Sequence, residues 1–161
     1  MPRYLEGNAI RLLRSGTEYF PALEAAIREA RTEIHLETYI FAGDATGLRF
    51  VDALSGAAQR GVAVRVLIDG FGARDMPRAL RDRLRDAGVR LLVFRPDISP
   101  IGLKRQRLRR MHRKLAVVDA RIAFIGGINI VDDLDEPGLL SPRHDYAVHI
   151  EGDRKSTRLN S

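Results

Sequence analysis

The sequence lacks cysteine and tryptophan altogether, and it has only four histidines among its 161 residues. Without cysteine the chain has no disulfide, no thiolate nucleophile and no cysteine-ligated zinc. The histidines are scattered and form no H-E-x-x-H pattern, so we expect neither a metal nor another cofactor. The longest apolar run, residues 122–131, is too short to span a bilayer, and residues 1–10 lack the apolar stretch of a signal peptide. We therefore expect metal-free chemistry in a soluble or peripheral chain.

Positive charge is in excess, because 27 lysine and arginine residues outnumber 21 acidic residues and give a formal net charge of +6. Hydrophobic residues make up 45% of the chain, which is a globular composition, and the length suits one folded domain with a real core. The charge favours anionic partners. By itself it does not separate nucleic acid from an anionic bilayer or a phosphorylated metabolite.

Strand and helix patterns alternate over the first 94 residues. Residues 15–33 have apolar positions at helical spacing, and Ser15 and Glu18 stand at the spacing of a capping box. Further helices are predicted at 47–60 and 76–87, and strands at 8–13, 34–41, 62–69 and 89–94. Such alternation predicts a crossover-linked, largely parallel sheet.

The alternation stops after residue 94. A proline-containing and then strongly basic connection leads to two close strands at 114–119 and 122–127, for which a hairpin is the simplest interpretation. A last strand is predicted at 145–152. Residues 153–161 have no apolar periodicity and nothing to bury.

The hairpin gathers several groups that suit phosphate chemistry. His112 and Lys114 are two residues apart at the start of a strand, so their side chains should point to the same side. A two-residue turn at 120–121 would pair Lys114 with Gly127 and His112 with Asn129. Because the sequence Ala-Arg lacks the glycine or asparagine that such turns favour, a register shifted by one residue stays open. His112 could attack phosphorus or carry a proton, while Lys114 and Asn129 could hold phosphoryl oxygens.

These segments resemble the phospholipase D superfamily, whose HKD motif is matched by "HRKLAVVDARIAFIGGIN". The resemblance covers about residues 8–152 and is greatest to the first half of bacterial cardiolipin synthases. It is carried by the segments "LETYIFAGDATG", "AAQRGVAVRVLIDGFG", "RRMHRKLAVVD", "FIGGIN" and "HDYAVHIEG". Many members of the superfamily have Gly-Ser where this chain has Gly126 and Gly127, and we interpret Gly-Gly as a feature of the synthase branch.

The resemblance implies an α/β fold of the phospholipase D type, an α-β-α sandwich with a mixed, largely parallel sheet and helices on both faces. Residues 1–152 would form one such domain, the first of two in a full-length synthase. The tail at 153–161 resembles no part of the family, and we expect it to be non-native.

The resemblance also implies the residues of the site. His112 would attack the phosphodiester and form a phosphohistidine, while Lys114 and Asn129 stabilise the phosphoryl charge. Asp119, the third letter of the motif, would be structural, capping the hairpin and pairing with a cation. Asp145 would orient the imidazole by accepting its Nδ1 proton; the alternative is a local turn bond at the start of its strand.

Four further residues are candidates for the phosphate site. Gly126 and Gly127 would let a phosphate approach the backbone closely. Glu37 lies in an apolar run and needs a partner, so it either lines the site or forms an ion pair with an arginine. Arg110 ends the basic run at 104–110, which is either a solvated loop or a contact for anionic lipid.

Members of the family bring two HKD motifs together, and this chain has one. We therefore expect a fragment of a cardiolipin-synthase-type phosphatidyltransferase, completed by a second half in cis or by a homodimer mate. Its expected substrate is an anionic phospholipid such as phosphatidylglycerol, at the cytoplasmic side of the bacterial inner membrane. The alternatives are a one-motif phosphodiesterase or endonuclease that dimerises on nucleic acid, and a non-catalytic half-domain that binds anions or lipid.

Overall fold

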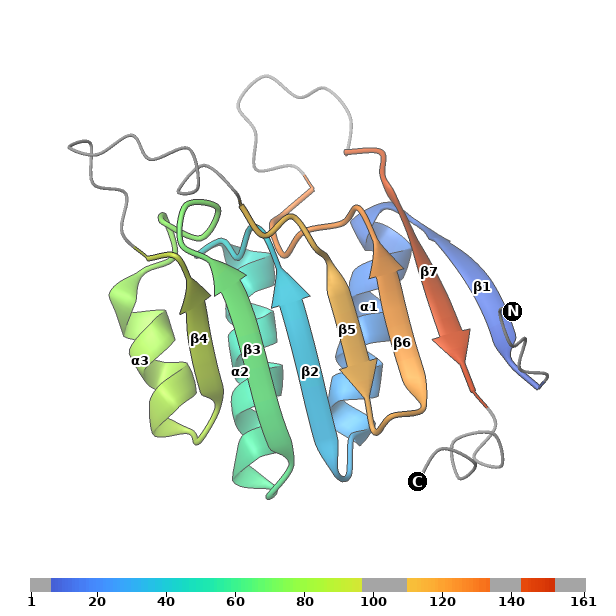
Figure 1. Ribbon diagram of the computed structural model, residues 1–161, viewed down its shortest axis with the longest axis horizontal. Coiled ribbons are helices and arrows are strands. Elements are labelled where there is room, and N and C mark those ends of the chain that lie inside the picture. The colour runs from blue at the N-terminus through green and yellow to red at the C-terminus, as the bar shows by residue number, and fades with distance from the viewer. Residues whose placement is uncertain (1–6, 97–109, 134–142, 153–161) are drawn as a thin grey trace.

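The computed structural model describes residues 7–96, 110–133 and 143–152. In these ranges the ten predicted helices and strands are all present, with the first helix ending at Glu29. The three helices are α1 (Ser15–Glu29), α2 (Ala45–Gln59) and α3 (Arg78–Asp86). The strands are β1 (Ala9–Arg14), β2 (Glu33–Thr38), β3 (Ala63–Asp69), β4 (Arg90–Phe94), β5 (Leu115–Val118), β6 (Ile122–Gly126) and β7 (Tyr146–Glu151). They form one sheet in the order β1-β7-β6-β5-β2-β3-β4 (Figure 1).

The sheet is mixed, which confirms the predicted α/β class, but its pairings are mostly antiparallel. Only β2–β3 and β3–β4 are parallel, whereas β5 pairs antiparallel with both β2 and β6, and β7 does so with both β6 and β1. The prediction of a largely parallel sheet is therefore wrong at the level of pairing. Strands β5 and β7 insert in the opposite direction between strands that share one direction.

The three described helices cover one face of the sheet (Figure 1). Helix α2 packs between α1 and α3, so the helices form one continuous layer. The expected helices on both faces are not seen in the ranges that the structure describes. The reason is topological: β1, β2, β3 and β4 succeed one another in a single direction across the sheet, and right-handed crossovers that all advance the same way place their helices on the same side.

The core lies between the sheet and this helical layer. Along β2, Ile34 and Leu36 are buried while the alternate residues Glu33, His35 and Glu37 are partly exposed. The same alternation on β3 and β5 gives the centre of the sheet an apolar side for the helices to cover. Among the described residues, no helix is long and apolar enough to cross a membrane.

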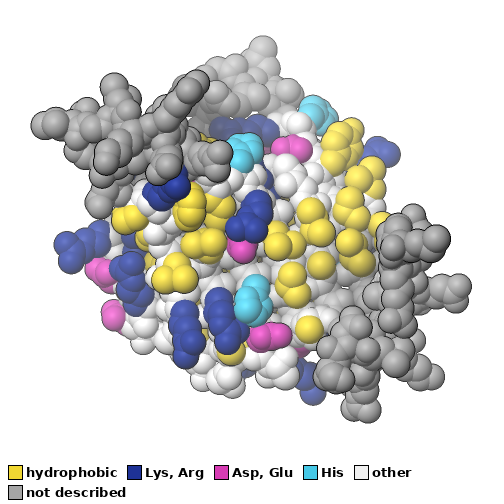
Figure 2. Space-filling model, viewed as in Figure 1, with side chains coloured by type: hydrophobic (Ala, Val, Ile, Leu, Met, Phe, Trp, Pro, Cys, Tyr) yellow, Lys and Arg dark blue, Asp and Glu magenta, His cyan; other side chains and the backbone are white. Residues whose placement is uncertain are grey.

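The opposite face of the sheet, here called the open face, also carries apolar side chains. Figure 2 shows hydrophobic residues spread across it, with a few charged side chains between them. Five large side chains on this face are more than a third exposed: Ile10, Leu12, Leu92, Ile125 and Tyr146. An exposed apolar surface that is contiguous over several strands is unusual for a solitary soluble domain.

Helix α1 does not begin with the predicted capping box. Its N-cap is Arg14, and Ser15 is the first helical residue, with a positive φ of 53°. The side chain of Asp133 accepts a hydrogen bond from the Gly16 amide at 2.8 Å, and Glu18 reaches back to the Arg14 amide at 3.0 Å. A distant aspartate therefore takes the place that Ser15 was expected to fill, and the Ser15 amide itself donates to the Asp145 carbonyl at 2.8 Å.

The hairpin register is shifted by one residue from the predicted pairing. Val118 lies opposite Ile122, so the turn has three residues, 119–121, and Lys114 lies opposite Gly126 instead of Gly127. Asp119 and Ala120 both take positive φ values, of 53° and 49°, and aspartate is among the residues that adopt this conformation most readily. The register agrees with the hydrogen bonds that attach Asp119 to the start of β2, and a rule based on the turn residues alone does not include these bonds.

Candidate active site

The imidazole of His112 and the ammonium of Lys114 meet directly in front of β5. The Lys114 Nζ lies 3.1 Å from both ring nitrogens of His112. The prediction that the two side chains point to the same side is therefore confirmed. His112 is exposed, whereas Lys114 is only 7% exposed, so an anion reaching the histidine from solvent would meet a cation held beneath it.

Burial changes the charge behaviour of Lys114. Removal from water lowers the pKa of its ammonium, and the nearby Asp145 carboxylate opposes this by favouring the charged form. A phosphate placed beside Lys114 would likewise favour the ammonium, because a second negative charge offsets the lost hydration. The site is thus arranged so that its cation is stabilised by an anionic ligand.

Asn129 does not pair with His112 across the hairpin as predicted. Both strands end before that point, and the segment after β6 turns toward the end of β2, where Ile130 and Phe41 form a bridge. The Asn129 Oδ1 accepts a hydrogen bond from the Ile40 amide at 3.0 Å. This fixes the side-chain amide with its oxygen already engaged, so its NH₂ group is the part available to a ligand oxygen.

Asp145 stands beside Asn129 in a cavity of about 340 Å³ that also contacts His144 and Asp133. Its Oδ1 accepts a hydrogen bond from the adjacent Tyr146 amide at 2.7 Å. This is the local turn bond that was expected as the alternative to orienting the imidazole. No hydrogen bond joins Asp145 to His112 among the described residues. The carboxylate is nevertheless close enough to Lys114 to act on its pKa.

Gly126 and Gly127 are needed because groups of the protein itself approach them closely, and their expected approach to a phosphate stays a prediction. A Cβ on Gly127 would lie 2.2 Å from the Asp145 Oδ1, and a Cβ on Gly126 would lie 2.4 Å from the Tyr146 carbonyl oxygen. Their amides donate to the carbonyls of Tyr146 and Lys114. The glycines therefore make room for β7 and for the Asp145 carboxylate, which occupies the space that a serine side chain at 127 would need.

Asp119 lies at the far end of β5, away from His112, as expected of a structural residue. Its carboxylate accepts hydrogen bonds from the amides of Arg31, Thr32 and Glu33 at 2.9, 2.8 and 3.0 Å. Burial alone would raise its pKa, but these bonds and one from the Thr32 hydroxyl outweigh it and lower the pKa to about 2. The expected cation is replaced by backbone amides.

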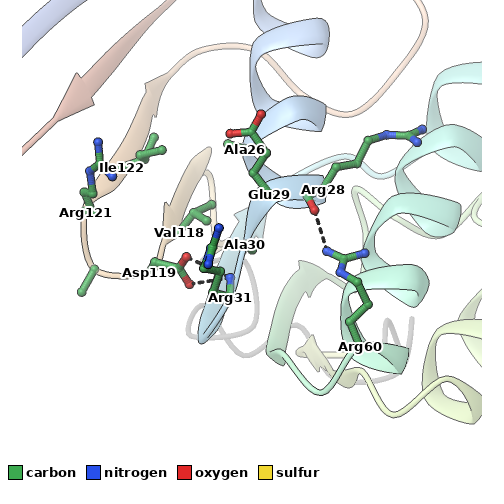
Figure 3. Close-up of a pocket in the computed structure, with 11 residues that line it drawn as sticks. Ala26, Arg28, Glu29, Ala30, Arg31, Arg60, Val118, Asp119, Arg121 and Ile122 are labelled. Carbon is green, nitrogen blue, oxygen red and sulfur yellow. Dashed lines mark hydrogen bonds between the residues drawn. The ribbon is translucent and has the colours of Figure 1, made fainter.

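A cavity of about 640 Å³ beside Asp119 contains several arginines (Figure 3). Three of their side chains already contact other groups of the protein. Arg28 pairs with Glu24 at 2.6 Å, Arg121 pairs with Glu151, and Arg60 donates to the Arg28 carbonyl at 2.8 Å. Because these groups are already engaged, and because the cavity is at the wrong end of the hairpin, it is not a second candidate for the reacting phosphate.

Glu37 forms an ion pair with Arg113 at 2.9 Å, so of its two expected roles the structure shows the ion pair. Arg113 directly follows His112, and the pair therefore ties the motif to β2. Arg110 lies over the ring of Phe71, with 5.3 Å from its guanidinium carbon to the ring centroid, and 3.9 Å from the Asp69 carboxylate. It is beside the site, and its role toward phosphate stays a prediction.

Two residues that the sequence did not single out contact the motif. The ring centroid of Tyr39 lies 4.8 Å from that of His112 and 5.5 Å from the Lys114 Nζ. Asp69, at the end of β3, accepts a hydrogen bond from the Met111 amide at 2.9 Å. Two features of the sequence could have indicated them. Tyr39 is two residues from Glu37 and was expected on the same side of the strand, and Asp69 is a carboxylate at the end of an apolar strand.

Several predictions fall outside the described ranges. They include most of the basic run at 104–110 and the tail at 153–161. Within the residues that the structure does describe, no three histidine, aspartate or glutamate side chains come together as metal ligands would.

The fold is that of the phospholipase D group. It superposes on Nuc of Salmonella typhimurium, a phospholipase D family member, with a TM-score of 0.65 at 21% identity, covering 94% of this chain and 88% of that one. It also superposes on phosphatidylserine synthase of Haemophilus influenzae with a TM-score of 0.65 at 20% identity, covering 88% of this chain and 33% of that one.

The sequence comparison is more specific. The family model described as "Cardiolipin synthase, PLD-like domain" matches residues 23–151, and the chain belongs to this family. It is 44% identical over 147 residues to cardiolipin synthase B of Escherichia coli, and 37% identical over 131 residues to the major cardiolipin synthase of Bacillus subtilis. These matches cover 91% and 81% of this chain, but 36% and 27% of the relatives, so the chain spans about a third of their length.

Proposed function

We propose that this chain is the first HKD half of a phosphatidyltransferase of the cardiolipin synthase type, acting through a phosphohistidine on His112. The observation that carries the proposal is the contact between the exposed His112 imidazole and the nearly buried Lys114 ammonium, 3.1 Å apart. Membership of the family and the 44% identity to a cardiolipin synthase support it.

In the first step, a ring nitrogen of His112 attacks the phosphorus of a phosphatidylglycerol-like lipid. A P–N bond forms and the P–O bond to the leaving glycerol breaks, with the electron pair going to the alkoxide. Lys114 and the Asn129 NH₂ group hold the non-bridging oxygens. Once the imidazole turns from Lys114 toward it, Asp145 accepts a hydrogen bond from the Nδ1–H group, which keeps its proton, and so stabilises the charged ring of the intermediate.

The second step reverses the first with a new alcohol. The acceptor oxygen forms a P–O bond as the P–N bond breaks, and its proton goes to the histidine of a second motif, which is neutral after giving a proton in the first step. The leaving alkoxide of the first step needs a proton, for which the histidine of a second motif is the proposed donor. Loss of a positioned general acid typically slows such a reaction about 100-fold to 10,000-fold. This chain is therefore proposed to need a second half in cis or a homodimer mate.

The proposed partner surface is the anionic cytoplasmic side of the bacterial inner membrane, where the chain would be peripheral. A net charge of +6 supports this location, since basic residues near an anionic bilayer contribute about 1 kcal/mol each. Arg110, which lies over the partly exposed ring of Phe71 beside the site, is proposed to contact lipid headgroups.

A second candidate is a one-motif phosphodiesterase that is completed by a second copy of itself. It is favoured by one observation, the fold match to Nuc with a TM-score of 0.65. Analytical ultracentrifugation tests this second candidate, because a strict monomer cannot bring two copies of the motif together and would exclude it.

The experiment uses bis(p-nitrophenyl) phosphate, whose leaving group departs without a proton and therefore needs no second motif. We expect nitrophenolate release together with a mass adduct on His112, and no adduct in His112→Ala. Binding of the ester without an adduct would contradict the proposal and favour a non-catalytic anion-binding domain. Incubation with phosphatidylglycerol vesicles and with plasmid DNA then distinguishes a lipid substrate from nucleic acid.

A further inference from the structure

Asp69 is a charged residue that lies entirely inside the protein. It is the last residue of β3, and its exposed fraction is 0%. One carboxylate oxygen, Oδ1, accepts hydrogen bonds from the amides of Phe71 and Gly72 at 2.9 and 3.2 Å. The other, Oδ2, accepts a buried hydrogen bond from the Met111 amide at 2.9 Å. The carboxylate thus joins its own turn to a segment more than forty positions along the chain.

A buried carboxylate is an unfavourable group with which to close a turn, because its charge loses contact with water. Moving it out of water is unfavourable unless its hydration is replaced, and here three backbone amides donate to it while the Arg110 guanidinium lies 3.9 Å away. The bond to Met111 lies one residue before His112. Residues 110–114 precede β5 and belong to no described helix or strand, so this bond fixes backbone that the sheet does not.

The turn at 71–72, whose amides bind Asp69, is also linked to His112 through Tyr39. An ideal Cβ on Gly72 would lie 2.2 Å from the Tyr39 carbonyl oxygen, so the turn is pressed against the residue whose ring contacts His112. One carboxylate therefore holds the backbone that leads into the imidazole and the turn that supports the ring beside it.

We propose that Asp69 is a positioning residue for His112. It touches no reacting atom, and it acts by holding Met111 and the turn at 71–72 so that the imidazole stays in reach of Lys114 and the phosphoryl group. The proposal deepens the proposed phosphohistidine function and rests on it for its catalytic meaning. A displacement of about 1 Å in such a group can slow a reaction on the order of 100-fold.

The test variant is Asp69→Asn, which keeps the shape and one acceptor oxygen for the turn but turns an NH₂ group toward the Met111 amide. The matched control is Glu24→Gln, which alters a carboxylate with 12% side-chain exposure that pairs with Arg28 and Arg49 between α1 and α2, far from the motif. A second variant replaces the Met111 amide by an ester, which removes the single N–H donor and leaves Asp69 unchanged.

The kinetic measurement follows nitrophenolate release and the His112 adduct with bis(p-nitrophenyl) phosphate. We expect Asp69→Asn and the Met111 ester to slow adduct formation on the order of 10-fold to 100-fold, with the half-saturating ester concentration changed less than about threefold. Glu24→Gln should stay within about twofold at a comparable loss of Tm. Equal rates in Asp69→Asn and Glu24→Gln would overturn the positioning role.

A second measurement does not depend on the chemistry. The His112 ring protons should carry an NMR shift from the adjacent Tyr39 ring, and that shift should diminish in Asp69→Asn and in the Met111 ester but persist in Glu24→Gln. An unchanged shift in both altered proteins would refute the proposal even if the wild-type chain forms no adduct. Absence of a wild-type adduct with a lost shift would count against the proposed function alone.

Discussion

At the scale of single residues, Lys114 is the group whose environment says most about the site. Its side chain is nearly buried, its Nζ contacts His112, and Asp145 is the acidic group that acts on its charge. A buried ammonium is unfavourable until an anion arrives, so binding of phosphate and protonation of Lys114 favour each other. This coupling gives the site a dependence on pH that a surface lysine would not have.

The first prediction concerns that dependence. Because burial lowers the pKa of Lys114, the ammonium loses its proton below the usual lysine range, and the attraction for phosphate falls as the pH rises through the lowered pKa. We expect the affinity for inorganic phosphate, measured by calorimetry over a rising pH series, to fall about tenfold or more once the pH exceeds that lowered pKa, in the Tyr39→Phe background that removes the phenol beside Lys114.

Lys114→Arg in the same background is the matched variant, since a guanidinium stays charged throughout this pH series. Its affinity should be lower at the start, because the planar group does not fit a site built for an ammonium, but it should stay level with pH. A parallel fall in both proteins would show that another group controls the binding.

At the scale of elements, the β5–β6 hairpin is positioned by its attachment to the start of β2. Asp119 accepts amide hydrogen bonds from Arg31, Thr32 and Glu33, and its own amide donates to the Glu33 carbonyl at 2.9 Å. These bonds fix the three-residue turn, and through it the register that places Lys114 opposite Gly126. The third letter of the motif therefore acts on the site through the hairpin.

The second prediction is a stability effect with a defined pH window. The folded pKa of Asp119, about 2, is below the ordinary value of 3.8, so the stabilisation is complete above about pH 4 and is lost as the pH falls toward 2. Allowing for solvent screening at a partly exposed group, we expect Asp119→Asn to lower the free energy of unfolding by about 1 to 2 kcal/mol at pH 7.

Urea denaturation at several pH values measures this effect, and the gap between wild type and Asp119→Asn should narrow from pH 7 toward about pH 3. Asp75→Asn, which changes a side chain that is 85% exposed, is the control and should be neutral. A gap that is independent of pH would mean that the charge of Asp119 does not carry the stabilisation.

At the scale of the whole molecule, the sheet has one face covered by helices and one face open (Figures 1 and 2). The open face presents Ile10, Leu12, Leu92, Ile125 and Tyr146, each of them more than a third exposed. Apolar residues at these positions gain little from folding in this structure. Their number on one surface indicates that the chain by itself will be prone to associate.

The third prediction follows from that face. Ile125→Lys should reduce binding of the dye ANS and reduce self-association, because the side chain is 49% exposed in the middle of the open face. The free energy of unfolding should change by no more than about 0.5 kcal/mol. Leu48→Lys is the matched control, a 41% exposed leucine on α2, and it should leave dye binding unchanged. A loss of several kcal/mol in Ile125→Lys would instead show that this face is covered.

The sequence by itself determined the local elements and the chemistry of the motif. Periodicity located each described strand and helix, because alternation and helical spacing are properties of neighbouring residues. The two-residue spacing of His112 and Lys114 likewise put both groups on one side, which the 3.1 Å contact confirms.

The tertiary structure alone decided the pairings between distant segments. Antiparallel β5 and β7 entered the sheet between strands of one direction, Asp133 replaced Ser15 at the start of α1, and Asp69 came to hold Met111. Each of these arrangements is stabilised by contacts between segments far apart in the chain, so the residue pattern within one segment does not predict it. The hairpin register is another example, because it is fixed by hydrogen bonds from the amides at the start of β2 to Asp119 and not by the residue preferences of the turn.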